Sequence, residues 1–157
     1  MKPVTALLLL GANLGDRART LRRAVAALRR LEGCRVEKVS RVYETAPVGP
    51  SRAPYLNMSA RLRTTRTPLG LLVEFKTLEA AAGRRPSKRW GARVLDIDLV
   101  SHGTTRRRTP WLSVPHPLMK ERLFAAQPLA DVSPSWRRRY AAMKPAPRKV
   151  KMPHGRP

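Results

Sequence analysis

Two aspartates inside an apolar run are the residues of this chain most suited to chemistry. Asp96 and Asp98 stand two positions apart within residues 94–100, whose other members are Val, Leu, Ile, Leu and Val. Such a run predicts a strand, and because side chains alternate along a strand, both carboxylates should point to one face, about 6 to 7 Å apart. Neighbouring carboxylates on a half-buried face repel each other and are costly to desolvate. A divalent cation relieves both costs, since Mg²⁺ prefers carboxylate oxygens and commonly bridges them to substrate phosphates.

Cationic side chains surround this pair in the sequence. They are Arg84, Arg85, Lys88, Arg89 and Arg93 before it, and His116 and Arg122 after it. Carboxylates that hold Mg²⁺ among guanidinium groups form a phosphoryl-transfer arrangement, in which cations neutralise the charge that develops in the transition state. The plainer interpretation is that Asp96 and Asp98 are ion-pair partners of surface arginines. For an isolated pair of aspartates in so basic a chain, that interpretation is the default.

The composition places this pair in a strongly cationic protein. The chain has 157 residues, enough for one domain with a real core, and 33 Lys and Arg against 10 acidic residues give a formal net charge of +23. This excess predicts attraction to polyanions that weakens with salt. Cys34 is the only cysteine, so no internal disulfide can form, which fits a reducing compartment. The first apolar run is too short for a signal peptide and no run is long enough to span a membrane, so we expect a cytoplasmic protein.

The elements that must hold the aspartates follow from the apolar patterns. These patterns predict, in order, strand 4–11, helix 16–32, strand 34–45, strand 55–64, helix 68–82 and strand 94–100. The two helices should end at Gly33 and Gly83, because glycine is typical of helix C-termini. This order indicates an α+β fold, in which helices pack on a mostly antiparallel sheet, close to a ferredoxin-like plait.

The end of the chain differs in character from the rest. From residue 132 onward it contains eight Lys or Arg, several prolines and no acidic residue. We therefore expect a folded domain over residues 1–140 and a basic, disordered tail over residues 141–157. Such a tail suits contact with a polyanion such as nucleic acid, although the chain contains no recognisable nucleic-acid-binding motif.

Four segments, in order along the chain, resemble one family. They are "LLGANLGDR" near the start, "VYETAPVGPSRAPYLN" from residue 42, "RWGARVLDIDLV" around the aspartates, and "TPWLSVPHPLMKERLF" from residue 109, continued by "QPLADVSP". The third segment is similar to the R-W-G-P-R-x-x-D-x-D signature of the 6-hydroxymethyl-7,8-dihydropterin pyrophosphokinases. Each segment alone is a modest signal. Four in register over residues 5–134 make the resemblance specific.

The resemblance implies transfer of pyrophosphate from ATP to the hydroxymethyl group of the reduced pterin in folate biosynthesis, with release of AMP. It implies two Mg²⁺ ions on Asp96 and Asp98, and a catalytic group formed by Arg84, Arg93, Asp96 and Asp98. By the same resemblance, ATP is held by Glu79, Arg89, Trp90, Arg93, Ser113, His116 and Arg122. The residues implied for the pterin are Gly11, Thr45, Val48, Tyr55, Asn57, Asp96 and Phe124, with the ring between the two aromatic side chains.

Several of these residues have plainer interpretations. Taken alone, Tyr55 and Phe124 are more often core aromatics than a ligand sandwich. Asn57 at the start of a strand is a common turn residue, and His116 between two prolines suits an ordered turn as well as a binding site. Trp90 in a polar loop is harder to explain as core and fits a lid over a nucleotide.

The chain departs from the family pattern at four positions. Ala92 stands where the family usually has proline, Pro86 where it often has arginine, and Ala125 and Ala126 where larger apolar residues are common. With the unusual positive charge, these departures leave two alternatives to the working enzyme. One is a polyanion-binding module that kept the fold and in which catalysis is weak or lost. The other is a diverged enzyme that acts on a related pterin or on another hydroxymethyl acceptor.

Overall fold

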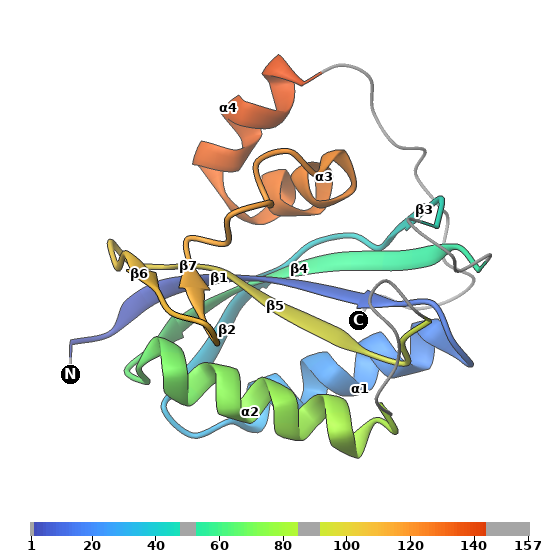
Figure 1. Cartoon of the computed structure of the whole chain (residues 1–157), viewed down its shortest axis with the longest axis horizontal. Helices are drawn as coiled ribbons and strands as arrows, with labels where there is room; N and C mark the ends of the chain where they lie inside the picture. Colours follow the sequence, from blue (N-terminus) through green and yellow to red (C-terminus); the bar gives the residue numbers. More distant parts are fainter. Residues whose placement is uncertain (1, 48–52, 85–91, 144–157) are drawn as a thin grey trace.

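The chain folds into a sheet covered by helices on both faces (Figure 1). The structure is a computed structural model that describes residues 2–47, 53–84 and 92–143. Its strands are β1 (Val4–Ala12), β2 (Cys34–Val39), β3 (Tyr43–Thr45), β4 (Tyr55–Thr64), β5 (Asp96–His102), β6 (Arg107–Arg108) and β7 (Ser113–Val114). Its helices are α1 (Arg17–Arg30), α2 (Pro68–Ala81), α3 (Leu123–Val132) and α4 (Pro134–Ala142). The α+β class expected from the sequence is confirmed.

The main sheet is antiparallel and has β1 in its interior. Among the described residues its order is β2-β4-β1-β5, with β3 beside β4, while β6 and β7 form a separate hairpin. The register places Gly11 of β1 opposite Asn57 of β4 on one side and opposite Asp96 of β5 on the other. Tyr43 of β3 continues this row beyond Asn57. Directly opposed side chains lie on one face of a sheet, so residues far apart in the sequence meet along this row.

Two apolar layers fix the helices to the sheet. Helices α1 and α2 cover one face, and α3 with α4 lies on the other (Figure 1). Because strand side chains alternate, Leu8 and Leu10 of β1 face the α1–α2 layer, whereas Leu7 and Leu9 face α3. Strand β1 is therefore buried on both sides, which explains its continuous apolar run.

The helix boundaries follow local sequence signals. The Asp16 carboxylate accepts a hydrogen bond from the backbone N–H of Arg19 at the start of α1, and Thr67 caps α2 in the same way through Gly70. Gly33 follows α1 in the left-handed region with φ of 73°, where a side chain would be strained. Both predicted helices are confirmed, and both end slightly earlier than expected.

Several boundaries differ from the sequence-based expectation. The strand expected over residues 34–45 is divided into β2 and β3, because the Ser40 hydroxyl accepts the Ser59 N–H and donates to the Arg41 carbonyl, which interrupts regular pairing. The aspartate strand begins at Asp96 instead of Val94 and continues to His102.

Helices α3 and α4 were not expected from the sequence. Helix α3 contains Pro128, normally a helix breaker, and seven of its ten residues are buried, so it lacks a clear amphipathic pattern. Helix α4 ends at Ala142, two residues beyond the expected domain boundary at residue 140. The remainder of the basic tail, residues 144–157, lies outside the described residues.

Candidate functional site

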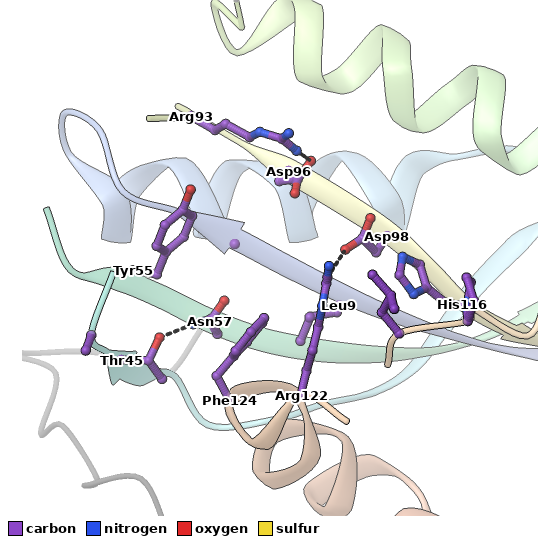
Figure 2. A pocket seen from close by; sticks show the side chains of 14 residues that line it. Leu9, Thr45, Tyr55, Asn57, Arg93, Asp96, Asp98, His116, Arg122 and Phe124 are labelled. Atoms are coloured by element: carbon purple, nitrogen blue, oxygen red, sulfur yellow. Dashed lines mark hydrogen bonds and ion pairs between the residues drawn. The ribbon is translucent and has the colours of Figure 1, made fainter. Parts of the chain in front are cut away.

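A cavity of about 340 Å³ opens on the sheet face that carries α3 (Figure 2). Strands β1, β3, β4 and β5 contribute to its walls, together with the segment before α3 and the first turn of that helix. Ten of the sequence-predicted site residues line it: Gly11, Thr45, Tyr55, Asn57, Arg93, Asp96, Asp98, His116, Arg122 and Phe124. The fold therefore brings together residues from four separate parts of the chain.

Gly11 forms the floor of the cavity between its two ends. A Cβ atom at this position would lie 3.1 Å from Asn57 Oδ1 and 3.7 Å from the Tyr55 ring. Because Gly11 has no side chain, Asn57 and Tyr55 can occupy their observed positions, and the floor stays open toward Asp96.

The charged end of the cavity is built around Asp96. Arg84 and Arg93 each donate a hydrogen bond to Asp96 Oδ1, at 2.8 and 2.7 Å. Asp96 and Asp98 lie on the same side of β5, while Ile97 and Leu99 between and beyond them are buried in the opposite layer (Figure 2). The predicted orientation of the carboxylate pair is confirmed. Asp96 also forms ion pairs with Arg84 and Arg93, as the plainer interpretation of the sequence predicts.

Asp98 is a perturbed carboxylate. Burial, and then the negative charge of Asp96, raise its pKa to about 6. The charge of Arg122 opposes this shift, with its Nη1 atom 3.9 Å from Asp98 Oδ2. A carboxylate pair with one member so easily protonated is a place where an additional cation would be stabilising.

Glu79 supports this end from outside the cavity. Its carboxylate is fully buried in α2, accepts the backbone N–H of Ile97 at 2.8 Å, and forms ion pairs with Arg84 and Lys76. It does not line the cavity. Glu79 therefore holds the beginning of β5 and the guanidinium of Arg84 in place.

The opposite end of the cavity is aromatic and amide-lined. Tyr55 and Phe124 come from β4 and α3, and the Asn57 amide stands on the floor near them (Figure 2). The Asn57 Nδ2 atom donates a 2.8 Å hydrogen bond to Thr45 Oγ1, which fixes the orientation of the amide. The guanidinium of Arg122 lies 5.7 Å from the centre of the Phe124 ring. This end suits a flat ring with hydrogen-bonding edges.

His116 lies beside Asp98 and Arg122 at the charged end (Figure 2). Its backbone N–H donates to the Val100 carbonyl at 2.9 Å, which ties the segment to β5. Burial, and then the charge of Arg122, lower the pKa of the imidazole, so the ring is neutral at pH 7. Its Nδ1 atom is buried without a hydrogen-bond partner among the described residues. A buried, unpaired ring nitrogen suggests a place for a ligand group.

Not every predicted residue reaches this cavity. Ser113 lies in β7 and lines a separate hollow with Arg106, Arg107 and Arg108, although Pro117 borders both spaces. The predictions for Val48, Arg89 and Trp90 fall outside the described residues.

Sequence reasoning missed Asn13 and four lining residues. Buried Asn13 accepts the backbone N–H of Arg93 through Oδ1 at 2.6 Å, and its own N–H donates to the Arg93 carbonyl at 3.0 Å. The missed lining residues are Leu9, Ala46, Pro117 and Leu118. The two-residue period of a strand identifies Leu9, which shares a face with Gly11. Ala46 and Pro117 directly adjoin the predicted residues Thr45 and His116, and Leu118 follows Pro117.

The fold and the cavity together define a class of protein. It is an α+β domain whose cavity has an aromatic, amide-lined end and an opposite end lined by two carboxylates and by cationic side chains. Among the described residues, no group of three or more His, Cys, Asp or Glu side chains could hold a metal ion by itself. The two aspartates would therefore need ligands from water or substrate, as Mg²⁺ sites in phosphoryl-transfer proteins commonly do.

Comparison with known proteins identifies the family within this class. Residues 7–134 match the 7,8-dihydro-6-hydroxymethylpterin-pyrophosphokinase family (HPPK), and the chain belongs to it. A 2-amino-4-hydroxy-6-hydroxymethyldihydropteridine pyrophosphokinase from Bacillus subtilis is 42% identical over 128 residues, which cover 81% of this chain and 77% of the relative. One of the same name from Synechocystis is 35% identical, over 81% of this chain and 65% of the relative. The resemblance stated from the sequence is confirmed.

Solved structures support the same fold. A crystal structure described as HPPK-DHPS in complex with substrates has a TM-score of 0.70 and 13% sequence identity, over 90% of this chain. The match occupies 43% of that longer chain, so the present chain spans less than half of it. A Plasmodium falciparum HPPK-DHPS gives a TM-score of 0.68 over the same share of this chain.

These findings favour the enzyme over the polyanion-binding alternative, for which the comparisons offer no support. No helix within the described ranges has both the length and the apolar character needed to cross a bilayer.

Proposed function

We propose that this chain transfers the pyrophosphoryl group of ATP to the hydroxymethyl group of 6-hydroxymethyl-7,8-dihydropterin, in folate biosynthesis. The hydroxymethyl oxygen attacks the β-phosphorus and loses its proton, while the bond from that phosphorus to the oxygen bridging it to the α-phosphate breaks. The products are the pterin pyrophosphate and AMP. The observation that carries this proposal is the position of the Asp96–Asp98 pair in the cavity that also contains Tyr55, Asn57 and Phe124.

The pterin is assigned to the aromatic end. Its ring stacks between Tyr55 and Phe124, and the oriented Asn57 amide contacts its hydrogen-bonding edge, since an amide offers both a donor and an acceptor. Gly11 forms the floor beneath the ring, and Thr45 fixes the orientation of the Asn57 amide through its hydrogen bond. Asn57 of β4 and Asp96 of β5 lie on either side of Gly11 in β1. The hydroxymethyl group of a pterin bound at Asn57 therefore extends across Gly11 toward the carboxylates.

The triphosphate is assigned to the charged end. The carboxylates of Asp96 and Asp98 are the candidate ligands of two Mg²⁺ ions, and the perturbed Asp98 carboxyl fits such a role. Bound Mg²⁺ would neutralise phosphate charge and polarise the β-phosphoryl group. Arg84 and Arg93, already directed at Asp96, stabilise the negative charge that develops on the transferred group and on AMP. Neutral His116 and Arg122 border the same space and hold the nucleotide.

Three finer assignments complete the proposal. The strand order β2-β4-β1-β5, with α1 and α2 on one face, supports a ferredoxin-like plait as the core of the domain. We assign the folded domain to the chain through α4 and the basic remainder to an appended tail. We place the reaction in the cytoplasm, which agrees with a chain whose only cysteine cannot form an internal disulfide.

The first test is AMP release from ATP and Mg²⁺ with and without the pterin. We expect pterin-dependent AMP from the unaltered chain and a loss of at least about 1000-fold in Asp96→Ala and Asp98→Ala, because each removes a proposed metal ligand. Glu74→Ala is the matched control, since it removes a carboxylate paired with Arg66 outside the cavity. Near-normal turnover in either aspartate variant would refute the metal assignment. Binding of the pterin without AMP release by the unaltered chain would refute the activity.

A further inference from the structure

A hydrogen-bonded cluster built on the buried Tyr43 joins the edge of the sheet to α3, away from the charged end of the cavity. The Tyr43 hydroxyl in β3 donates a 2.7 Å hydrogen bond to Asp131 Oδ2, near the end of α3. The backbone N–H of Arg41 also donates to Asp131, and its guanidinium forms an ion pair with that carboxylate at 3.3 Å. Asp131 follows Tyr43 by 88 positions and Arg41 by 90 positions in the sequence, so these contacts join distant parts of the chain.

The chemistry of this cluster keeps the connection intact over a wide pH range. The Tyr43 side chain is completely buried, and burial together with its bond to Asp131 raises its pKa to about 12. Burial alone would raise the pKa of Asp131, but the hydrogen bonds from Tyr43 and Arg41 outweigh it and lower that pKa. A neutral phenol that donates to an ionised carboxylate is a strong and directional contact.

Both ends of this connection lead to the aromatic end of the cavity. Tyr43 stands opposite Asn57 in the pairing of β3 with β4, in the cross-strand row that includes Gly11 and Asp96. Asp131 stands seven residues after Phe124 on α3, which is two helical turns, or about 10 Å along the axis, and on nearly the same side of the helix. The cluster thus links the strand row that holds Asn57 to the helix that carries Phe124.

The other contacts between α3 and the sheet provide little directional restraint. An apolar cluster joins Leu7 and Leu9 of β1 and Val100 of β5 to the Ala125, Leu129 and Val132 side chains of α3. Apolar contacts are non-directional, and an alanine lacks the shape that would fix one helix position. At its first turn α3 has no side-chain cap. Arg61 donates to the carbonyl of Val132 at 3.2 Å, which again anchors only the far end of the helix.

We propose that Tyr43 and Asp131 are positioning residues that set the distance of Phe124 from Tyr55 and Asn57, and thereby the affinity for the pterin. This inference rests on the proposed placement of the pterin between Tyr55 and Phe124. Neither residue lines the cavity, so both act through α3. The nucleotide contacts at Asp96, Asp98 and Arg93 belong to other elements and do not depend on this connection, whereas Arg122, at the start of α3, would move with the helix.

The test compares three variants by titration with the pterin and by steady-state kinetics. Tyr43→Phe removes only the hydroxyl, and Asp131→Asn keeps the shape but removes the charge. We expect the pterin Kd to rise about tenfold in each, while the KM for ATP rises less, because most of the proposed nucleotide contacts lie outside α3. Thr64→Val is the matched control, because it also removes a buried hydroxyl from a strand, bonded to the Gly33 carbonyl at the far end of β4.

A double-mutant cycle separates this inference from the function on which it rests. If Tyr43 acts through Phe124, Tyr43→Phe should weaken pterin binding no further in a Phe124→Ala chain. A Kd for Tyr43→Phe that matches that of Thr64→Val, or full additivity in the cycle, would overturn the positioning role and leave the pterin site intact. If Phe124→Ala alone leaves the pterin Kd unchanged, the placement of the pterin is wrong, and the positioning role is overturned with it.

Discussion

Asn13 and Arg93 are joined by two backbone-directed hydrogen bonds across eighty residues of sequence. The Asn13 side chain accepts the Arg93 N–H, and the Arg93 carbonyl accepts the Asn13 N–H. The side chain of Arg93 reaches Asp96 from this anchored backbone. The turn after β1 therefore holds one of the two arginines directed at Asp96.

Loss of this anchor should slow the chemical step more than it weakens pterin binding. We expect Asn13→Ala to lower kcat by about 10- to 100-fold, because a misplacement of roughly 1 Å at a reacting centre can cost that much. Rapid-quench measurement of AMP release in a single turnover checks this expectation. In an Arg93→Ala chain the same change should add little, and independent multiplication of the two losses would argue against the anchor.

Protonation of Asp98 should control metal binding below neutral pH. Its pKa of about 6 lies above the usual value of 3.8, so in the metal-free protein this carboxyl takes up a proton as the pH falls through 6. Between pH 6 and pH 3.8 the Asp98 carboxyl is mainly protonated in the native state and mainly ionised in the unfolded chain. Because the native state binds more protons there, this group adds to the stability of the metal-free fold as the pH falls across that range.

Mg²⁺ binding has the opposite dependence, because it requires the ionised carboxylate. Calorimetric titration should show an apparent Mg²⁺ affinity that falls as the pH drops below 6. Carbon NMR of the metal-free protein gives the Asp98 midpoint directly. In Asp96→Asn that midpoint should move down, because the neighbouring negative charge is removed. A midpoint near 4 in the unaltered chain would contradict the prediction.

A methyl group on the cavity floor should interfere with pterin recognition. In Gly11→Ala the new Cβ approaches Asn57 Oδ1 to about 3.1 Å, so the amide must shift or lose its bond to Thr45. We expect a rise of about tenfold in the pterin Kd, measured by fluorescence titration. Gly70→Ala adds the same methyl near the start of α2, away from the cavity, and should leave that Kd unchanged.

Two truncations distinguish the basic tail from the folded domain. Removal of residues 144–157 should leave AMP release and the melting temperature close to those of the full chain. Removal from Pro134 onward also deletes Trp136, which packs against the apolar layer under α3, and should cost about 2 kcal/mol or more of unfolding free energy. Loss of pterin or ATP binding in the shorter deletion would show that the domain extends further.

The common orientation of the carboxylate pair was predictable because strand periodicity is a local property, whereas the other site residues were predicted from the family resemblance. Alternation alone put Asp96 and Asp98 on one face, and the structure confirms it. Asn13 was not predictable, since it acts on the backbone of a residue eighty positions away and no local pattern marks such a contact. Likewise, the buried position of Glu79 depends on how α2 packs beside β5. Helix α3 was missed because Pro128 and the burial of most of its residues remove the usual signals.

Because β1 lies in the interior of the sheet, enzymatic activity should appear only after β5 has paired with it. This strand comes first in the sequence, yet its two partners in the cross-strand row, β4 and β5, are synthesised much later. A nascent chain that stops short of β5 can pair β1 on one side only and has no carboxylates to place beside Gly11. Closing the loop between β1 and β5 is the most distant of the strand pairings and carries a corresponding entropic cost. Recovery of AMP release during refolding should therefore lag behind formation of the β1–β4 hydrogen bonds, so that incomplete chains bind neither substrate productively.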